Sequence, residues 1–349
     1  MKIAVFLPNW VGDAVMATPA VRALRQHYSG AEVIGVLKPY LSGVFDGAPW
    51  FDRLLPLDPA GPWAQRWFRV AARLRSERID LAVLFPNSFH SALVAWLGRC
   101  RRRVGYVRYA RGLLLTDRLL PIRDERGRLR PSPVIEAYNR LAVAAGCPPP
   151  SFRMELFTTE RDERAADEVW QQTGLAKAAQ VVCLNSGGAF GAAKHWPIDH
   201  FARLAQELAD RRGSGVLVLC GPSERDLARQ IVARAQRDSV RSLADFPLSL
   251  GLTKACVRRC DLLVTTDSGP RHFAAAFDRP VVTLFGPTHI AWTETYHPRA
   301  VHLQKPVPCG PCQQRVCPLD HCCMTGLIPA EVYAAAARLL DGRLSLLDH

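Results

Sequence analysis

Short apolar runs alternate with helical stretches along the first half of the chain. Three such runs, each long enough for one strand, occupy residues 2–7, 31–37 and 80–85. After the first run, apolar side chains recur at helical spacing from Ala14 toward Gly30. Uninterrupted apolar runs are typical of strands buried on both faces of a parallel sheet, and their alternation with helices indicates βαβ units. The pattern predicts an α/β domain over residues 1–155.

A second series of the same kind follows. The stretch "CPPPSFRMELFTTERDERA" after Gly146 is rich in proline and then in charge, which is typical of a linker that leads into a helix, here near residues 161–174. Four further strand-like segments occupy residues 180–188, 215–222, 261–269 and 280–288. A chain of 349 residues exceeds the size of most single cores. We therefore predict a second α/β domain over residues 156–349, and a cleft between the strand ends of the two.

Asp13 follows the first predicted strand, in "NWVGDAVMATP". Ligands of open α/β sheets bind outside the carboxyl ends of the strands, and this strand-to-helix turn must lie there. An acid at that position either caps the helix or faces a substrate. Position alone leaves both interpretations open.

All four predicted strands of the second half end in small or polar residues. The loops are Asn185-Ser186-Gly187-Gly188, Gly221-Pro222-Ser223-Glu224, Asp267-Ser268-Gly269-Pro270 and Gly286-Pro287-Thr288. Glycine-rich turns that open onto helix N-termini suit phosphate, because backbone N–H groups and the helix dipole both favour an anion. The dinucleotide fingerprint and the P-loop motif are both missing from the sequence. Four loops of this type nevertheless predict a nucleotide site.

Several charged residues accompany these loops. Lys194 precedes Trp196-Pro197, where a new helix can begin, and it either reaches a bound diphosphate or is an ordinary surface lysine. Carboxylates at strand ends, such as Glu224 and Asp267, accept hydrogen bonds from ribose hydroxyls or cap helices. His272 is either a phosphate donor or a packing histidine.

Charge narrows the choice of partner. The chain has 45 Lys and Arg against 32 Asp and Glu, a net charge of +13, and Arg is concentrated at residues 99–103 and 123–130. Such an excess indicates an anionic partner, or simply an arginine-rich solvated surface. Helix-turn-helix, RNP-type and regular zinc-finger patterns are missing from the sequence, so we expect no nucleic-acid partner. No apolar stretch reaches about 18 residues and the N-terminus lacks a signal-peptide core, so we expect a cytoplasmic protein.

Five of the eleven cysteines crowd into "CGPCQQRVCPLDHCC", Cys309 to Cys323. The C-x-x-C start and the adjacent His321 are compatible with structural zinc. Reduced, reactive thiols and a disulfide are the alternatives. We predict no metal site.

Three stretches together resemble the ADP-heptose:lipopolysaccharide heptosyltransferases, glycosyltransferase family 9. They are "NWVGDAVMATPAVRAL", "SGGAFGAAKHWPIDHFARLA" and "TTDSGPRHFAAAFDRPVVTLFGPT", in the family's order over nearly the whole chain. The N-W-V-G-D opening and the late cysteine cluster are most similar to the members that add the second heptose, although members that add the first share most of these motifs.

The resemblance implies a GT-B architecture, with two Rossmann-like parallel-sheet domains facing a central cleft. The N-terminal domain would bind the acceptor and the C-terminal domain the ADP-sugar. It also implies an inverting, metal-independent transfer of L-glycero-D-manno-heptose from ADP-heptose to the first heptose of the lipopolysaccharide inner core, without a cofactor. A GT-B nucleotide-sugar epimerase would share the donor loops but need no lipid acceptor.

The family's roles carry over to matching positions. Asp13 matches the catalytic base, which inversion requires on the side of the sugar opposite the departing ADP. The positions that match donor-binding residues are Ser186, Gly187, Lys194, Glu224, Asp267, Ser268, Gly269 and His272. The sequence departs from the family at Ser186-Gly187-Gly188-Ala189, where the pattern "PGAE" is expected.

An anionic acceptor would give the arginine-rich region a function. The resemblance implies a lipid A–Kdo–heptose acceptor, whose carboxylates and phosphates guanidinium groups bind bidentately. The arginines that we expect to bind it are Arg101, Arg102, Arg103, Arg108 and Arg111. Arginine beside the apolar "GLLL" also predicts peripheral contact with the cytoplasmic face of the inner membrane.

Overall fold

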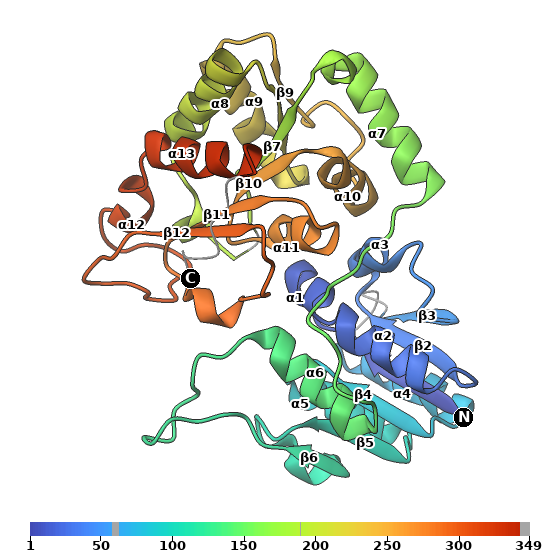
Figure 1. Cartoon of the computed structure of the whole chain (residues 1–349). Helices are drawn as coiled ribbons and strands as arrows, with labels where there is room; N and C mark the ends of the chain where they lie inside the picture. Colours follow the sequence, from blue (N-terminus) through green and yellow to red (C-terminus); the bar gives the residue numbers. More distant parts are fainter. Residues whose placement is uncertain (58–62, 189, 343–349) are drawn as a thin grey trace. The chain divides into compact units, whose positions relative to one another are not determined.

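The chain folds into two α/β units (Figure 1). The computed structural model describes residues 1–57, 63–188 and 190–342. Unit 1 comprises Met1–Phe157 and a short return segment, Ala291–Thr295, and unit 2 comprises Thr158–Ile290 and the chain from Tyr296 onward. The first boundary lies close to the predicted one, between residues 155 and 156, whereas no sequence signal indicated the return segment.

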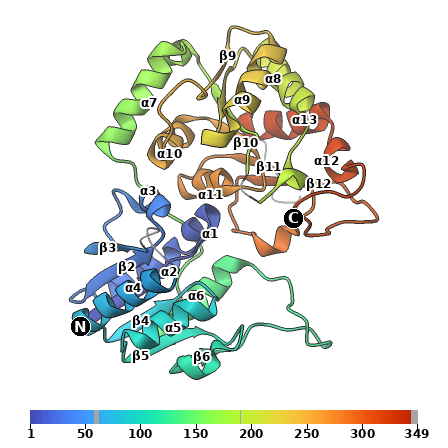
Figure 2. The same ribbon diagram turned by 180° about the vertical axis from the view of Figure 1, so that it is seen from behind.

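Unit 1 is built on a six-stranded parallel sheet of order β3-β2-β1-β4-β5-β6. Its strands are β1 (Lys2–Phe6), β2 (Glu32–Leu37), β3 (Arg53–Pro56), β4 (Leu81–Leu84), β5 (Arg102–Tyr106) and β6 (Asp117–Leu119). Its helices are α1 (Val11–Met16), α2 (Thr18–His27), η1 (Pro39–Leu41), α3 (Ser42–Phe45), α4 (Trp63–Glu77), α5 (Phe89–Leu97), η2 (Arg111–Leu114) and α6 (Val134–Ala145). Helices α1, α2 and α6 pack together, as do α4 and α5, so the sheet is covered on both faces (Figure 2).

Burial explains which strands the sequence revealed. The three predicted runs are β1, β2 and β4 at the centre of the sheet, where nearly every side chain is buried. The strands that were not predicted, β3, β5 and β6, carry exposed residues such as Arg53 and Arg102. Half-exposed strands lack the continuous apolar run that marks a central strand of a parallel sheet.

Unit 2 has a second six-stranded parallel sheet, of order β12-β11-β10-β7-β8-β9. Its strands are β7 (Val181–Asn185), β8 (Gly215–Leu219), β9 (Val240–Ser242), β10 (Leu262–Thr266), β11 (Val281–Phe285) and β12 (Ala300–Gln304). Its helices are α7 (Glu160–Gln172), η3 (Leu175–Lys177), η4 (Ala192–Lys194), α8 (Ile198–Arg212), η5 (Pro222–Glu224), α9 (Arg225–Ala235), α10 (Leu250–Arg259), α11 (Gly269–Ala276), α12 (Cys322–Thr325) and α13 (Pro329–Leu340). A further turn, η6, spans Ile290–Trp292.

The two sheets share one topology. Read in chain order within each unit, both have the strand order 3-2-1-4-5-6 of the Rossmann fold, so the predicted fold class is confirmed. In such a sheet the connections diverge between the first and fourth strands, and ligands bind at the carboxyl ends beside that switch point. The switch points lie between β1 and β4 in unit 1, and between β7 and β10 in unit 2.

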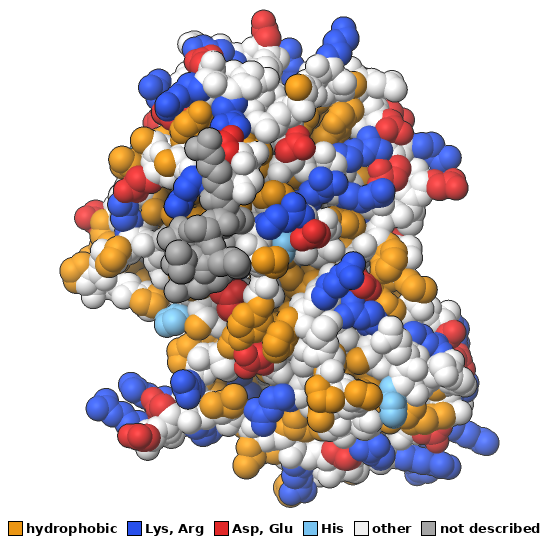
Figure 3. Space-filling view, in the orientation of Figure 1, with side chains coloured by type: hydrophobic (Ala, Val, Ile, Leu, Met, Phe, Trp, Pro, Cys, Tyr) orange, Lys and Arg blue, Asp and Glu red, His pale blue; other side chains and the backbone are white. Residues whose placement is uncertain are grey.

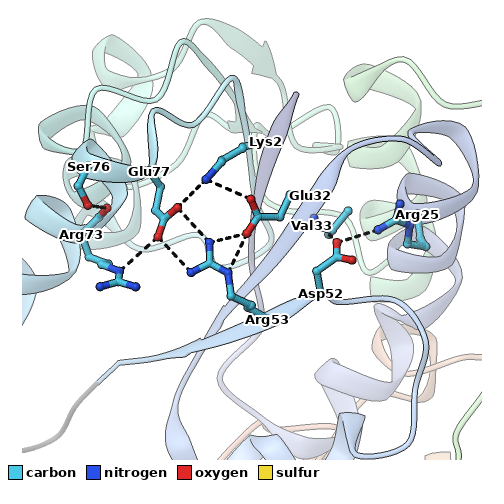
Figure 4. A network of polar contacts seen from close by, with 9 residues as sticks. All are labelled: Lys2, Arg25, Glu32, Val33, Asp52, Arg53, Arg73, Ser76 and Glu77. Atoms are coloured by element: carbon cyan, nitrogen blue, oxygen red, sulfur yellow. Dashed lines mark hydrogen bonds and ion pairs between the residues drawn. The ribbon is translucent and has the colours of Figure 1, made fainter.

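The opposite, amino edge of the first sheet carries a network of ion pairs (Figure 4). Lys2 Nζ lies 2.8 Å from Glu77 Oε2 and 3.1 Å from Glu32 Oε2. Arg53 joins the same two carboxylates, and Arg73 lies 3.3 Å from Glu77. Hydrogen bonds from Arg53 and Lys2 lower the pKa of Glu77 to about 2. The network ties β1, β2 and β3 to the end of α4, away from the ligand edge.

Among the helices that the structure describes, none is both long and apolar enough to cross a bilayer.

Candidate active site

Asp13 lies in the first turn of α1, directly beyond the carboxyl end of β1. Its side chain is half-buried. The N-cap position belongs to Trp10, which makes no side-chain cap hydrogen bond, so Asp13 is the third residue of the helix rather than its cap. The helix therefore begins earlier than the predicted Ala14, and the carboxylate lies at the ligand edge of unit 1.

Two tyrosines that the sequence analysis missed accompany Asp13. Burial and then the charge of Asp13 raise the pKa of Tyr40, and the same two causes raise the pKa of the buried Tyr138 on α6 well above its usual value. The Tyr40 hydroxyl donates a hydrogen bond to the carbonyl of Asn9, in the loop that leads into α1. Both hydroxyls thus stay protonated near Asp13. Their distance along the chain from Asp13 explains why no local motif revealed them.

In unit 2, the loops after β7 and β10 meet at the switch point. Asn185, the last residue of β7, donates from Nδ2 to Ser268 Oγ at 2.9 Å and to Thr265 Oγ1 at 3.0 Å. The Thr266 hydroxyl donates to the carbonyl of Gly187 at 3.2 Å. These bonds fix the two predicted donor loops against each other. Asn185 belonged to a quoted loop but not to the predicted site residues.

Lys194 and Asp267 form the centre of this site. Lys194 Nζ lies 2.6 Å from Asp267 Oδ2 and donates to the Asp267 carbonyl at 2.8 Å. Arg271 approaches Asp267 Oδ1 at 3.4 Å, and the Thr288 hydroxyl donates to Oδ2 at 2.8 Å. The ring of Phe190 lies 4.5 Å from Lys194 Nζ. Lys194 is 8% exposed and is therefore no surface lysine, which excludes that alternative.

The electrostatics of this cluster favour an anionic ligand. Burial alone would raise the pKa of Asp267, but the charges of Lys194 and Arg271 and the hydrogen bonds from Lys194 and Thr288 hold it well below its usual range. Asp267 is therefore ionised at neutral pH. Two cations share this one carboxylate, so the three side chains together carry a net positive charge in a buried position, where electrostatic interactions are strong.

Glu224 joins the loops after β7 and β8. Its carboxylate accepts hydrogen bonds from the backbone N–H of Gly188 at 3.0 Å and of Gly221 at 2.7 Å. A Cβ at Gly187 would overlap this carboxylate, so any other residue there would displace the Glu224 side chain. The predicted residues Gly187 and Glu224 are thus brought into contact.

Two polar atoms at the same edge have no hydrogen-bond partner among the described residues. They are Ser186 Oγ and His272 Nδ1, and both side chains are almost fully buried. Burial, and next the charge of Arg271, lowers the pKa of His272 well below its usual value, so the imidazole is neutral at pH 7. Buried polar groups are normally hydrogen-bonded, which makes both atoms suitable for contacts with a ligand.

Helix α11 begins at Gly269, next to this cluster. Ser268 is its N-cap residue and makes no side-chain cap hydrogen bond to the helix. The first N–H groups of a helix are left without intrahelical partners and attract anions. Ser268 and Gly269 therefore belong to the same candidate site as Lys194 and Asp267.

The cysteine-rich segment supports the Lys194 loop. The N–H of Ala193 donates to the Arg315 carbonyl at 3.0 Å, and His321 Nε2 lies 2.6 Å from the Ala193 oxygen. Gln313 N–H donates to the Pro287 carbonyl at 2.8 Å, next to Thr288.

All five cysteines of the segment have free thiols. Over residues 1–57, 63–188 and 190–342, no group of three or more His, Cys, Asp or Glu side chains is arranged to hold a metal ion. Ala189, at the departure from the family pattern, lies outside the described residues.

Three of the predicted acceptor-binding arginines lie at the amino edge of the sheet, opposite the edge that carries Asp13. Arg102 pairs in register with Leu81, which pairs with Ile3 at the beginning of β1, so Arg101, Arg102 and Arg103 lie at the amino edge. Arg102 binds Asp117 at 2.8 Å, and Arg103 donates to the Leu114 carbonyl. Asp13 lies at the carboxyl edge, so the placement of these arginines does not support a site shared with it. The sequence analysis did not recognise that a strand begins with these arginines.

Arg111 also differs from the prediction. It is fully buried, and its guanidinium donates to the Tyr106 carbonyl at 2.8 Å, to the Pro86 carbonyl and to Asn87 Oδ1 at 3.1 Å. It holds the loop after β4 rather than an external ligand. Arg108 is half-buried at the carboxyl edge, over the Tyr109 ring, and is the one member of the predicted group with that placement.

Comparison with known proteins decides the family. Residues 67–323 match glycosyltransferase family 9 (heptosyltransferase). The chain belongs to this family. It is therefore a glycosyltransferase.

Individual relatives of this glycosyltransferase are heptosyltransferases, in agreement with the family match. It is 30% identical over 305 residues to lipopolysaccharide heptosyltransferase 2 of Escherichia coli, covering 82% of this chain and 83% of that one. It is 27% identical to lipooligosaccharide heptosyltransferase 2 of Campylobacter jejuni, over 97% of this chain and 98% of the relative. The solved structure of E. coli ADP-heptose lps heptosyltransferase II superposes with a TM-score of 0.79 at 26% identity, covering 98% and 99% of the two chains. The two parallel sheets thus form the GT-B architecture that the sequence predicted.

Proposed function

We propose that this glycosyltransferase transfers L-glycero-D-manno-heptose from ADP-heptose to the first heptose of the lipopolysaccharide inner core, with inversion at the anomeric carbon. The observation that carries the proposal is the buried Lys194–Asp267–Arg271 cluster at the switch point of the second sheet. A net positive group beside the start of α11 and a glycine loop is suited to a nucleoside diphosphate. The activities for which the relatives are named supply the donor, ADP-heptose, and the lipopolysaccharide acceptor.

Unit 2 would bind the donor. Lys194 and the N–H groups at Ser268 and Gly269 would stabilise the negative charge that grows on ADP as the anomeric bond breaks. The neutral His272, with an unpartnered Nδ1, would donate or accept a hydrogen bond on the donor. Glu224 would retain a lone pair for a ribose hydroxyl while it holds Gly188 and Gly221. These roles require no resident cofactor.

Unit 1 would bind the acceptor. Asp13 would accept the proton of the attacking acceptor hydroxyl, as the general base of an inverting reaction. The protonated Tyr138 would keep the carboxylate oriented. Trp10, which is 48% exposed beside Asp13, would offer an apolar face to the acceptor saccharide. The enzyme would work in the cytoplasm, in peripheral contact with the inner membrane that holds its acceptor.

Release of ADP from ADP-heptose tests the reaction. Turnover should occur with an acceptor that already carries one heptose and not with the heptose-free acceptor. Turnover with the heptose-free acceptor alone would instead assign the transfer of the first heptose. Absence of sugar transfer to either acceptor, together with epimerisation of the free nucleotide sugar, would overturn the proposal in favour of an epimerase.

A further inference from the structure

The segment of unit 1 that follows β5, residues 107–130, exposes large apolar side chains. We name it the basic–apolar arm. Its exposed members are Tyr109 at 67%, Leu113 at 86%, Leu120 at 70% and Ile122 at 42%. Single exposed apolar side chains are ordinary on protein surfaces, but a cluster of them within one short segment marks an interaction site. The arm is thus a candidate interaction surface.

The same arm is strongly basic. It contains seven arginines and three acidic residues, and of these arginines only Arg111 is buried. Asp117 is paired with Arg102, and Asp124 accepts the N–H groups of Arg126 and Arg128 within the turn. Two of the three acids are therefore engaged inside the unit. Figure 3 shows basic side chains on the projection at the lower left, with acidic side chains between them near its tip.

The arm has a defined conformation and a defined location. Asp124 N–H donates to the Arg128 carbonyl at 2.8 Å and Arg130 N–H to the Ile122 carbonyl at 3.2 Å, which forms an antiparallel hairpin. The hairpin leaves the sheet from the carboxyl end of β6, and Tyr109 follows the carboxyl end of β5. Both views of the ribbon show the segment between β6 and α6 extending away from the sheet (Figures 1 and 2). Since all six strands are parallel, the arm leaves from the same edge of unit 1 that carries Asp13.

We propose that the basic–apolar arm docks unit 1 on an anionic phospholipid bilayer, with Leu113 and Leu120 entering the interface and the arginines binding headgroup phosphates. Exposed leucines gain nothing from a soluble polyanion or a nucleic acid, whereas the interface of an anionic bilayer accommodates both kinds of side chain. The proposal rests on the proposed function in one respect: a lipid-anchored acceptor would then meet unit 1 at the edge that carries Asp13.

Vesicle binding of the full chain tests the arm without any turnover. We compare sedimentation with vesicles of phosphatidylglycerol and phosphatidylcholine against vesicles of phosphatidylcholine alone. The first variant is Leu113→Ser/Leu120→Ser, and the second is Arg123→Ser/Arg126→Ser/Arg130→Ser. Each should weaken binding to the anionic vesicles by about tenfold or more. The matched control is Arg99→Ser/Arg101→Ser, because these exposed arginines lie at the amino edge of the same sheet.

The outcomes separate this inference from the proposed function. Unchanged vesicle binding by both arm variants, or an equal loss in the control, would overturn the docking role. Equal binding of wild-type protein to neutral vesicles would also contradict it, since charge would then play no part. Full activity of the arm variants on a deacylated, water-soluble acceptor would support it. A wild type that binds anionic vesicles but releases no ADP from ADP-heptose would overturn the proposed function and leave the docking surface intact.

Discussion

Lys194 and Asp267 form a buried ion pair, with Nζ 2.6 Å from Oδ2, where the loops after β7 and β10 adjoin. Removal of one partner from a buried pair typically costs about 3–5 kcal/mol. We therefore expect Lys194→Ala to lower the stability of unit 2 by about that amount and to weaken ADP binding by about tenfold or more. Calorimetric titration with ADP and thermal unfolding measure the two effects.

A control separates these effects from the general loss of a lysine. Lys177 is exposed in the same unit, so Lys177→Ala should change neither ADP affinity nor stability. If Lys194→Ala folds and binds ADP as the wild type does, the lysine serves only to neutralise Asp267 and the diphosphate role is wrong.

Asp13→Asn should abolish most of the turnover and leave donor binding intact. The amide keeps the shape of the side chain but cannot accept a proton, and a general base contributes about 10²–10⁴-fold to rate. The proposed donor residues all belong to unit 2, so affinity for ADP-heptose should be unchanged. Initial rates of ADP release and equilibrium titration with the donor check both parts. Glu160→Gln, which removes a carboxylate that is 93% exposed on α7, should retain full activity. If the Asp13→Asn enzyme is active, Asp13 is not the general base. Its role would then be structural, as an acid in the first turn that interacts favourably with the dipole of α1.

The sequence was most informative where side chains are buried in regular patterns. The central strands, such as β1 and β10, are buried and largely apolar, and the loops after them carry Asp13 and Asp267. It was misleading at β5, where Arg102 and Arg103 are strand residues at an exposed beginning. Contacts between residues that are distant in the sequence could not be predicted either, because a single sequence does not show which of them lie close together in the fold.

Two site residues illustrate that limit. Arg271 and Thr288 both contact Asp267, although Thr288 comes from the loop after a different strand. Thr288 was quoted only as part of a loop, and Arg271 only within the motif that carries the family resemblance. The parallel register of β10 and β11 brings their loops together, and register is a property of the folded sheet.

Gly187→Ala tests the contact with Glu224. The new Cβ would overlap the carboxylate, so Glu224 must move and release the N–H groups of Gly188 and Gly221. We expect weaker binding of ADP and only a small loss of stability, because the Glu224 carboxylate is the end of a flexible side chain and the N–H groups of Gly188 and Gly221 are only half-buried. Gly30→Ala is the control, since a Cβ there meets no atom within 4 Å. Retained ADP affinity in Gly187→Ala would place the loop after β7 outside the donor site.

Arg111→Met distinguishes a structural arginine from an acceptor-binding one. The substitution removes the guanidinium hydrogen bonds to the carbonyls of Tyr106 and Pro86 and to Asn87 Oδ1, and each buried acceptor left without a donor costs about 1–3 kcal/mol. We expect a clear fall in the thermal midpoint of unit 1. Arg101→Met should have no such effect, since the Arg101 side chain is 80% exposed. A stable Arg111→Met protein with a raised KM for the acceptor would return Arg111 to the acceptor site.

The amino-edge network predicts a specific acid sensitivity. Hydrogen bonds from Arg53 and Lys2 lower the pKa of Glu77 from 4.5 to about 2 in the folded chain. A carboxylate with a depressed pKa stabilises the fold above its unfolded pKa, and this contribution disappears as the pH falls toward 2. We therefore expect the free energy of unfolding to fall less steeply between pH 5 and pH 2 in Glu77→Gln than in the wild type. Exposed pairs contribute only about 0–1 kcal/mol each, so urea midpoints at closely spaced pH values are needed.

Glu160→Gln, whose carboxylate is 93% exposed, should follow the wild-type curve. Parallel curves for Glu77→Gln and the wild type would mean that the unfolded chain keeps the same ion pairs.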